Sequence, residues 1–225
     1  QQPVTGIIVS PMENKFILSF SVHLCAWLIA LPLGVVASFY RGSIFDRMLQ
    51  GIAYAFLSIP GFFLAMLLVF VAAHWTRLPI GGMTSLGYER LSWGGKALDI
   101  VRHMIVPLTV LSLGSAAYLF RLMRSNMLDV LPRDFVRVLQ TRGLPKRTIL
   151  FGHVFRNAVN PLITILGFQF PALFSGAALV EIITGWPGLG TVMLQAVRSQ
   201  DIFLVMGNMV MISFLLIIGN LFADL

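Results

Sequence analysis

The sequence predicts an all-α integral membrane protein, and two observations support this prediction. Hydrophobic residues occupy 57% of the 225 positions and charged residues only 11%, with a mean hydropathy of +0.87. A soluble domain of this length has too little interior to bury so much apolar surface. In addition, five separate segments stay apolar over about 20 residues, the length that a helix needs to cross the hydrocarbon core. We therefore expect one multi-pass transmembrane domain over residues 1–225.

The five predicted transmembrane helices lie at residues 16–40, 52–75, 104–123, 161–181 and 202–222. Each segment is longer than the apolar core of a signal peptide. Pro60 and Gly61 interrupt the second helix, and Pro171 interrupts the fourth. Such breaks often lie beside the pathway of a transporter, although a simple packing kink is the alternative. Pro60 and Pro171 are therefore candidate pathway or gate residues.

The basic residues orient the predicted helices across the membrane. Ten of the 16 Lys and Arg residues fall on the side of the first and third connections, and six fall on the other side. The larger group is Arg41, Arg47, Arg121, Arg124, Arg133, Arg137, Arg142, Lys146, Arg147 and Arg156, and the smaller is Lys15, Arg77, Arg90, Lys96, Arg102 and Arg198. Because cytoplasmic loops carry the excess, the third connection is predicted to be cytoplasmic and the amino end external. Trp75 and Trp186 then suit an aromatic belt at the outer interface.

The third connection, residues 124–160, contains two predicted amphipathic helices. Asp134 is the expected N-cap of the first helix, and Gly143 is placed as its C′ glycine. The second helix is expected to start near Pro145 and to end before Pro161 opens the next span. A basic helix pair of this kind lies on lipid headgroups or docks in a groove of a cytosolic partner, and the pattern alone leaves both open.

The sequence offers little for catalysis, for a metal or for a cofactor. There is no G-x-S-x-G or H-E-x-x-H sequence, so an intramembrane hydrolase is disfavoured. His23, His74 and His103 lack metal-ligand spacing, and the single cysteine, Cys25, excludes a disulfide framework within the chain. The basic residues do not alternate with aromatic residues as in a nucleic-acid-binding surface. We therefore predict no catalytic residue, no metal site, no cofactor and no nucleic-acid partner.

A family resemblance appears in the third connection. The stretch RVLQTRG at 137–143 follows Asp-Phe-Val at 134–136 and precedes HVFRNAVNP, with Pro161 eighteen positions after the glycine. It resembles the EAA loop of ABC-importer permeases. The spacing is similar to that of the dipeptide, oligopeptide and nickel branch, whose D-Y-V-R-T-A-R-A-K-G-L string differs here chiefly at Val138, Leu139, Gln140 and Thr141. Further similar stretches are LPLGVVASFYRGSIFDR at 31–47, LSIPGFFLAMLLVF at 57–70, RHMIVPLTVLSLG at 102–114 and VEIITGWPGLG at 180–190.

The resemblance covers essentially all 225 residues and implies a type I ABC-importer permease in the inner (cytoplasmic) membrane. Such a subunit performs no chemistry. It pairs with a second permease, sits on two cytosolic ATPases and receives solute from an extracytoplasmic binding protein. The branch implies peptides as solutes, with nickel or peptide-like antibiotics as alternatives. A further helix before Gln1 and a short tail after Leu225 are also expected. An ATP-independent carrier or channel fits the predicted helices equally well and is the alternative function.

The resemblance assigns ATPase coupling to the loop at 124–160, with Gly143 as the joint between its two helices. The expected apolar contacts are Phe135, Val138, Leu139, Leu144 and Ile149, and the polar contacts are Arg137, Arg142, Lys146 and Arg147. The alternative is that these basic residues are solvated and serve only to orient the protein in the membrane.

Glu181 ends the fourth predicted helix on the outer side. An ionisable group in a membrane helix is a candidate pathway or gate residue, although solvation at the interface is the alternative. The GWPGLG stretch at 185–190 lacks the Lys-Ser/Thr ending of a phosphate-binding loop. It is predicted to be an external turn near the binding protein, carrying Trp186, Pro187, Gly188 and Gly190, or an ordinary tight turn.

Overall fold

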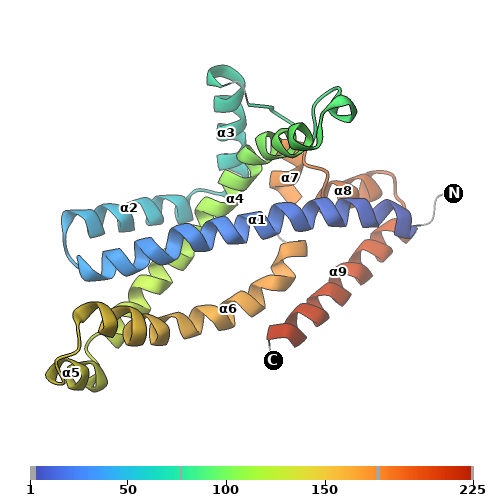
Figure 1. Ribbon diagram of the computed structural model, residues 1–225. Helices are drawn as coiled ribbons and strands as arrows, with labels where there is room; N and C mark the ends of the chain where they lie inside the picture. Colours follow the sequence, from blue (N-terminus) through green and yellow to red (C-terminus); the bar gives the residue numbers. More distant parts are fainter. Residues whose placement is uncertain (1–3, 77, 176–177, 224–225) are drawn as a thin grey trace. The chain divides into compact units, whose positions relative to one another are not determined.

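The computed structural model describes the backbone of residues 4–76, 78–175 and 178–223 (Figure 1). Side chains are described for residues 11–76, 78–165, 178–214, 216–218 and 221. The chain divides into two compact units. The first unit comprises Gln1–His23, Ile59–Ser112 and Phe168–Leu225, and the second comprises Leu24–Ser58 and Leu113–Gly167.

The second unit is a bundle of helices from four parts of the chain. It contains the end of α1 (Val4–Phe39), α2 (Ile44–Ser58), the end of α4 (Trp93–Val130), α5 (Asp134–Thr141), the π-helical segment η2 (Thr148–Val154) and the start of α6 (Phe155–Ser175). Many of its buried residues are alanines on α1 and α4. At Gly34 the two helices approach so closely that a Cβ would lie 2.8 Å from the Met123 Cβ. Small residues permit this approach, which drives helix association in lipid.

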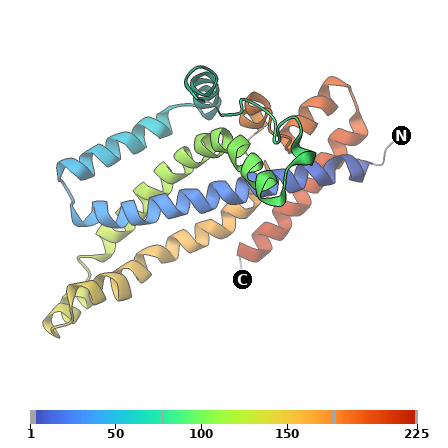
Figure 2. The same cartoon turned by 45° about the horizontal axis from the view of Figure 1, so that its top comes forward.

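Side-chain hydrogen bonds of Ser43 and Asp46 cap the start of α2 and fix the turn that follows α1. The Ser43 Oγ accepts a hydrogen bond from the Asp46 N–H at 3.2 Å, and the Gly42 N–H donates to the Asp46 carboxylate at 2.9 Å. The Arg124 guanidinium of α4 donates two hydrogen bonds to the same carboxylate, at 2.6 and 2.7 Å. The turn is thus tied to α4, and α2 runs back along the second half of α1 (Figures 1 and 2).

The first unit collects the remaining helices. Besides the start of α1 and of α4 it contains α3 (Gly61–Trp75), the short η1 (Tyr88–Arg90), α7 (Ala178–Thr184), α8 (Leu189–Arg198) and α9 (Ile202–Ala223). α7 lies against both α3 and α8, and α8 lies against α9. Trp186 packs with Leu18, Val22 and Met104 in one apolar cluster, whereas α8 and α9 form a second.

The connection between α3 and α4 is held by polar contacts to α4. The Ser85 N–H and hydroxyl donate to the Asp99 carboxylate at 2.8 and 2.6 Å. Lys96 forms an ion pair with Glu89 at 3.0 Å and lies over the Tyr88 ring. The predicted outer connection is therefore ordered by its own side chains, and it leaves Ser92 exposed.

The helix bounds differ from the predicted ones in instructive ways. The predicted helix 52–75 is two helices, which are separated at Ile59 and Pro60; the Pro60 carbonyl accepts the first hydrogen bonds of α3. The predicted helix 104–123 is the middle of the longer α4, which continues through Pro107. The predicted helix 161–181 corresponds to parts of α6 and α7, and the α6 backbone remains helical at Pro161.

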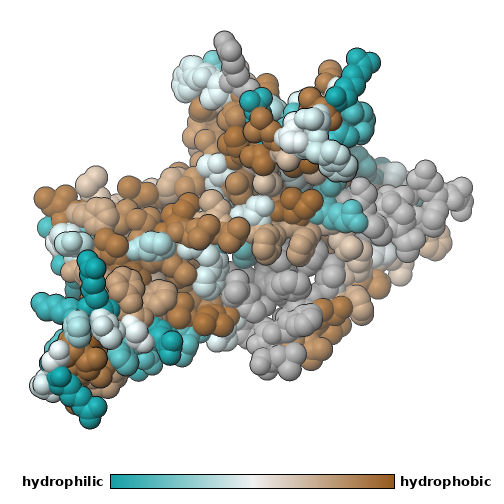
Figure 3. All heavy atoms as spheres, in the orientation of Figure 1, coloured by the Kyte–Doolittle hydropathy of each residue, from teal (hydrophilic) through white to brown (hydrophobic). Residues whose placement is uncertain are grey.

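Two helices in the described part of the chain are long and apolar enough to cross a membrane, over Pro11–Phe39 and Trp93–Val130. α2 and α3 make a third if they are counted together as one broken span. Large apolar side chains such as Leu28, Met48 and Phe203 are exposed on these helices and on α9. Figure 3 shows hydrophobic residues over much of the visible surface. Exposed apolar surface of this extent fits a lipid environment.

Candidate functional site

α5 ends in a Schellman motif built on Gly143. Gly143 has a φ of +76°, as its position after the predicted helix indicated. Its N–H donates to the Gln140 carbonyl at 3.0 Å, and the Leu144 N–H donates to the Leu139 carbonyl at 3.4 Å. No described atom lies within 4 Å of a Cβ built on Gly143. A side chain there would therefore strain the backbone without meeting a neighbour.

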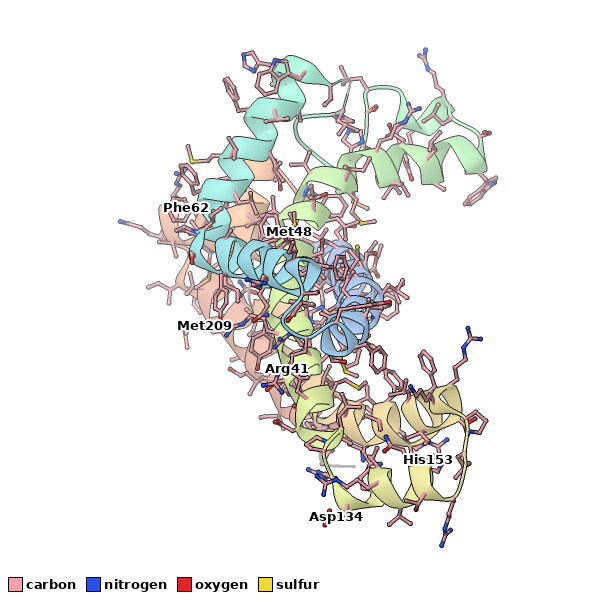
Figure 4. All side chains as sticks on the ribbon, turned by 90° about the vertical axis from the view of Figure 1, so that its left-hand side faces the viewer. Arg41, Met48, Phe62, Asp134, His153 and Met209 are labelled. Carbon is pink, nitrogen blue, oxygen red and sulfur yellow. The ribbon has the colours of Figure 1, made fainter. Side chains whose placement is uncertain are left out.

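After this turn the chain runs back beside α5. Figure 4 shows Asp134 at the start of α5 and His153 on the returning segment, η2. Asp134 is the first helical residue rather than the predicted N-cap, a position held by Arg133. The predicted second short helix does not end before Pro161, because η2 continues directly into α6. A groove at this hairpin is lined by Leu131, Val136, Gln140, Leu144, Lys146, Ile149 and Leu150.

The predicted apolar coupling residues do not share one surface. Phe135, Leu139 and Leu144 are partly buried and pack against the core of the second unit. Ile149, in the π-helical segment η2, is only 3% exposed and lines the groove at the hairpin. Its contact with a partner stays a prediction. Val138, in contrast, is 49% exposed.

The predicted basic coupling residues all lie on the outside of the hairpin. Arg137, Arg142, Lys146 and Arg147 are exposed. The Arg137 guanidinium lies 3.8 Å from the Asp134 carboxylate, but both side chains are largely in solvent, so this pair contributes little. The hairpin therefore carries a basic surface with the exposed Val138 on the same element (hydrophilic patch over α5 in Figure 3).

A second site lies in the first unit, where Lys15 and Glu181 form a buried ion pair. The Lys15 Nζ donates to the Glu181 Oε1 at 2.5 Å, and the side chains are 2% and 1% exposed. The Gly190 N–H, near the start of α8, donates to the Glu181 Oε2 at 2.8 Å. Glu181 thus neutralises a cation of α1 and also satisfies a free amide at a helix N-terminus. Such a pair joins α1, α7 and α8 at one point.

The glycines of GWPGLG make room for this carboxylate. A Cβ on Gly188 would lie 2.6 Å from the Glu181 Cδ, and a Cβ on Gly190 would lie 2.6 Å from the Ala178 Cβ. Gly185 has a φ of +64° and ends α7, with the Trp186 N–H donating to the Glu181 carbonyl at 2.9 Å. The stretch is therefore a tight turn folded around Glu181.

The structure corrects two expectations about this stretch. Trp186 is 0% exposed and its indole N–H donates to the Asn14 carbonyl at 3.2 Å, so it is not part of an interfacial belt. Gly188 and Gly190 are buried and Pro187 is partly buried, and a contact of this turn with a binding protein stays a prediction. The alternative of solvated Glu181 is also wrong, because its carboxylate is enclosed.

Lys15 was not predicted as the partner of Glu181. Lys15 was counted only as an outer topology charge, yet both residues were predicted at outer ends of helices, and opposite charges at one membrane depth are a signal for pairing. Pro60 lies at the break before α3 and is exposed. Pro171 lies within α6, and its side chain is outside the described residues.

Comparison with known proteins identifies the family. Residues 30–225 match the model of the family "Binding-protein-dependent transport system inner membrane component". The dipeptide transport system permease protein DppB of Escherichia coli K12 is 34% identical over 240 residues, covering 96% of this chain and 71% of that protein. The oligopeptide transport system permease protein AppB of Bacillus subtilis strain 168 is 32% identical, covering 99% of this chain and 69% of that protein.

A solved structure shares the fold. A chain of the MetNI methionine ABC transporter, in an inward-facing conformation, matches with a TM-score of 0.75 at 17% identity and covers 100% of this chain and 96% of that one. The fold is therefore that of a type I ABC-importer permease, as the resemblance implied. The chain belongs to the binding-protein-dependent transport system inner membrane components and is a multi-pass permease subunit of an ABC importer.

Proposed function

We propose that this permease carries peptides and forms the translocation pathway together with a second homologous permease. Identity of 32–34% to a dipeptide and an oligopeptide permease over nearly the whole chain supports this solute class. Nickel and peptide-like antibiotics are the alternative solutes. Two cytosolic ABC ATPases drive the cycle, and an extracytoplasmic binding protein delivers the solute. The permease itself hydrolyses no ATP and holds no cofactor.

The observation that carries the proposal is the basic, partly apolar surface of the α5–η2 hairpin. Arg142, Lys146 and Val138 are exposed there, while Phe135 and Leu144 anchor the hairpin on the core of the second unit. A hairpin that is fixed to the bundle transmits the movement of a bound partner to the transmembrane helices. A ligand shifts a conformational equilibrium only through contacts that differ between two states, and a rigid hairpin provides such contacts.

The excess of basic residues on that side supports a cytoplasmic location for the hairpin. The residues that contact the ATPases are Val138, Arg137, Arg142, Lys146 and Arg147. The two arms of the hairpin that carry them meet at Gly143. The Lys15–Glu181 pair, at the predicted outer ends of membrane helices, contributes to a gate, and Pro60 and Pro171 lie along the pathway. A buried ion pair at the ends of membrane helices is suited to this role, because its strength changes steeply when water enters.

Co-purification with the ATPases tests the coupling surface. The permease with Arg142→Glu and Lys146→Glu is compared with Arg156→Glu, an exposed basic residue of α6 outside the hairpin surface. Exposed ion pairs are worth up to about 1 kcal/mol each, so the double variant should retain several-fold less ATPase at low salt and lose this difference at high salt. The Arg156→Glu variant should retain the parental amount.

An ATP-independent carrier or channel remains the competing function, and it needs no ATPase docking. If the double variant and the parent recover equal amounts of ATPase, the basic residues of the hairpin do not couple the permease to the ATPases. Recovery of a homo-oligomer that transports solute without any ATPase would favour the carrier.

A further inference from the structure

Asn208 is a buried amide without hydrogen-bond partners. It lies in the middle of α9, with Leu204 one turn before it and Met211 and Ile212 one turn after it on the inward stripe of the helix. Its side chain is 0% exposed, and neither the Nδ2 nor the Oδ1 has a partner in the described part of the chain. An Asn side chain offers two donors and one acceptor oxygen, and burying them unpaired is unfavourable. An unsatisfied group of this kind calls for a functional explanation.

The short helix α8 covers this part of α9. Leu189, Val192 and Ala196 of α8 pack in the same apolar cluster as Leu204 of α9, and Met12 of α1 closes the cluster. α8 packs against α9, and the turn between them contains Gln200, which has a φ of +55°. The contacts within this cluster are apolar, so none of them provides a hydrogen bond to the Asn208 amide.

The start of α8 is fixed by the buried ion pair. Glu181 accepts a hydrogen bond from the Gly190 N–H and is itself held by Lys15. Apart from bonds within α8 and its turns, this is the polar contact that ties α8 to the rest of the first unit among the described residues. Opening of the pair would release the amino end of α8, while its carboxyl end stays joined to α9.

We propose that α8 is a movable cover over Asn208, and that Asn208 contacts the solute when α8 swings away. The proposal rests on the transport function proposed above, because it assigns Asn208 to the pathway of that function. A peptide group carries one N–H donor and one carbonyl acceptor, which the Asn amide can pair with simultaneously. The unpaired amide also destabilises the closed state, and this makes opening easier. Asn208 thus favours opening of the cover and also binds the solute.

Cysteine labelling tests the movement without reference to the solute. Asn208→Cys in a Cys25→Ser background is assembled with the second permease and the ATPases in proteoliposomes. It is then treated with a small maleimide without nucleotide, during ATP turnover and after vanadate trapping. Labelling should be at least fivefold faster in one of these states than in another. Ala65→Cys, a matched control at a fully buried position of α3, should label slowly in all of them. Equal labelling of Asn208→Cys in every state would overturn the proposal.

Substitution by an apolar residue of similar size tests the contact with solute. Asn208→Leu removes the unpaired amide, so its melting temperature should equal or exceed that of the parent, while peptide uptake should fall at least fivefold. Leu204→Met, one turn away in the same cluster, should keep uptake within twofold. Parental uptake by Asn208→Leu would make the amide a tolerated packing defect and would overturn the proposal. If Asn208→Leu does not assemble, the labelling experiment decides.

The two experiments also separate this proposal from the proposed function. A parent complex that takes up no peptide would refute the solute class, whereas the labelling of Asn208→Cys would still report whether α8 moves. Conversely, peptide uptake by the parent with state-independent labelling would leave the transport function standing and reject the cover.

Discussion

The buried Lys15–Glu181 pair should dominate the stability of the first unit in a way that a double-variant cycle can measure. Each side chain is at most 2% exposed, and the two charges are 2.5 Å apart. Removal of one partner leaves the other charge buried and unpaired, which costs about 3–5 kcal/mol. At about 2–4 °C per kcal/mol for a chain of this size, Lys15→Met should lower the melting temperature by roughly 6–20 °C.

The double variant separates the charge effect from packing. Lys15→Met combined with Glu181→Gln removes both charges, and the Gln carbonyl can still accept the Gly190 N–H. Replacement of a buried ion pair by neutral groups of similar size is often nearly neutral. We therefore expect the double variant to recover most of the lost stability, with a coupling energy of about 2 kcal/mol or more between the two sites.

Thermal unfolding followed by far-UV circular dichroism in one detergent provides the measurement. Lys96→Met is the control, because Lys96 pairs with Glu89 at 3.0 Å but Glu89 is 86% exposed. An exposed pair contributes up to about 1 kcal/mol, so the control should shift the melting temperature by at most about 4 °C. The reasoning is refuted if Lys15→Met shifts it no more than Lys96→Met, or if the double variant loses the sum of the two single losses.

Three further predictions concern the joint of the hairpin, the topology and the packing of α1. Gly143→Val should reach the membrane but lose ATPase association, because a β-branched residue at a φ of +76° costs about 1–2 kcal/mol or more, whereas Gly143→Asn should retain more; equal association of both would exclude the strain argument. Single cysteines at Thr148 and Ser92 in a cysteine-free background should react with an impermeant maleimide from opposite sides of the membrane, and reaction of both from outside would overturn the orientation. Gly34→Val should destabilise the second unit by about 1–3 kcal/mol, because its Cβ would lie 2.8 Å from the Met123 Cβ; an unchanged melting temperature would contradict the close packing.

Much of the helical architecture could be predicted from apolar length and capping signals. The break at Pro60 and the positive φ of Gly143 follow from the restricted backbone of proline and the freedom of glycine. The helix ends were harder to predict, because α4 extends beyond its apolar segment in both directions. Polar turns continue a helix when their own hydrogen bonds and contacts support it, and an apolar window does not detect them.

The sites depended on contacts that a local pattern does not contain. Glu181 was recognised as unusual, but its pairing with Lys15 joins residues 166 positions apart. The family resemblance assigns Ile149 to a partner surface. In the structure it lies in the π-helical segment η2 and is buried, which the sequence pattern did not indicate. Trp186 was placed at the membrane interface by its residue type, whereas its environment is set by α1 through the Asn14 carbonyl.

Uptake into proteoliposomes shows whether this permease belongs to an ATP-driven importer. The permease is reconstituted with its second permease and two ATPases, and the vesicles are supplied with the binding protein and a radiolabelled dipeptide. Uptake should require both ATP on the side of the α5–η2 hairpin and binding protein on the opposite side, and it should be insensitive to a collapsed ion gradient. Uptake that proceeds without ATP and follows an imposed ion gradient would contradict the account and identify the chain as part of a secondary carrier.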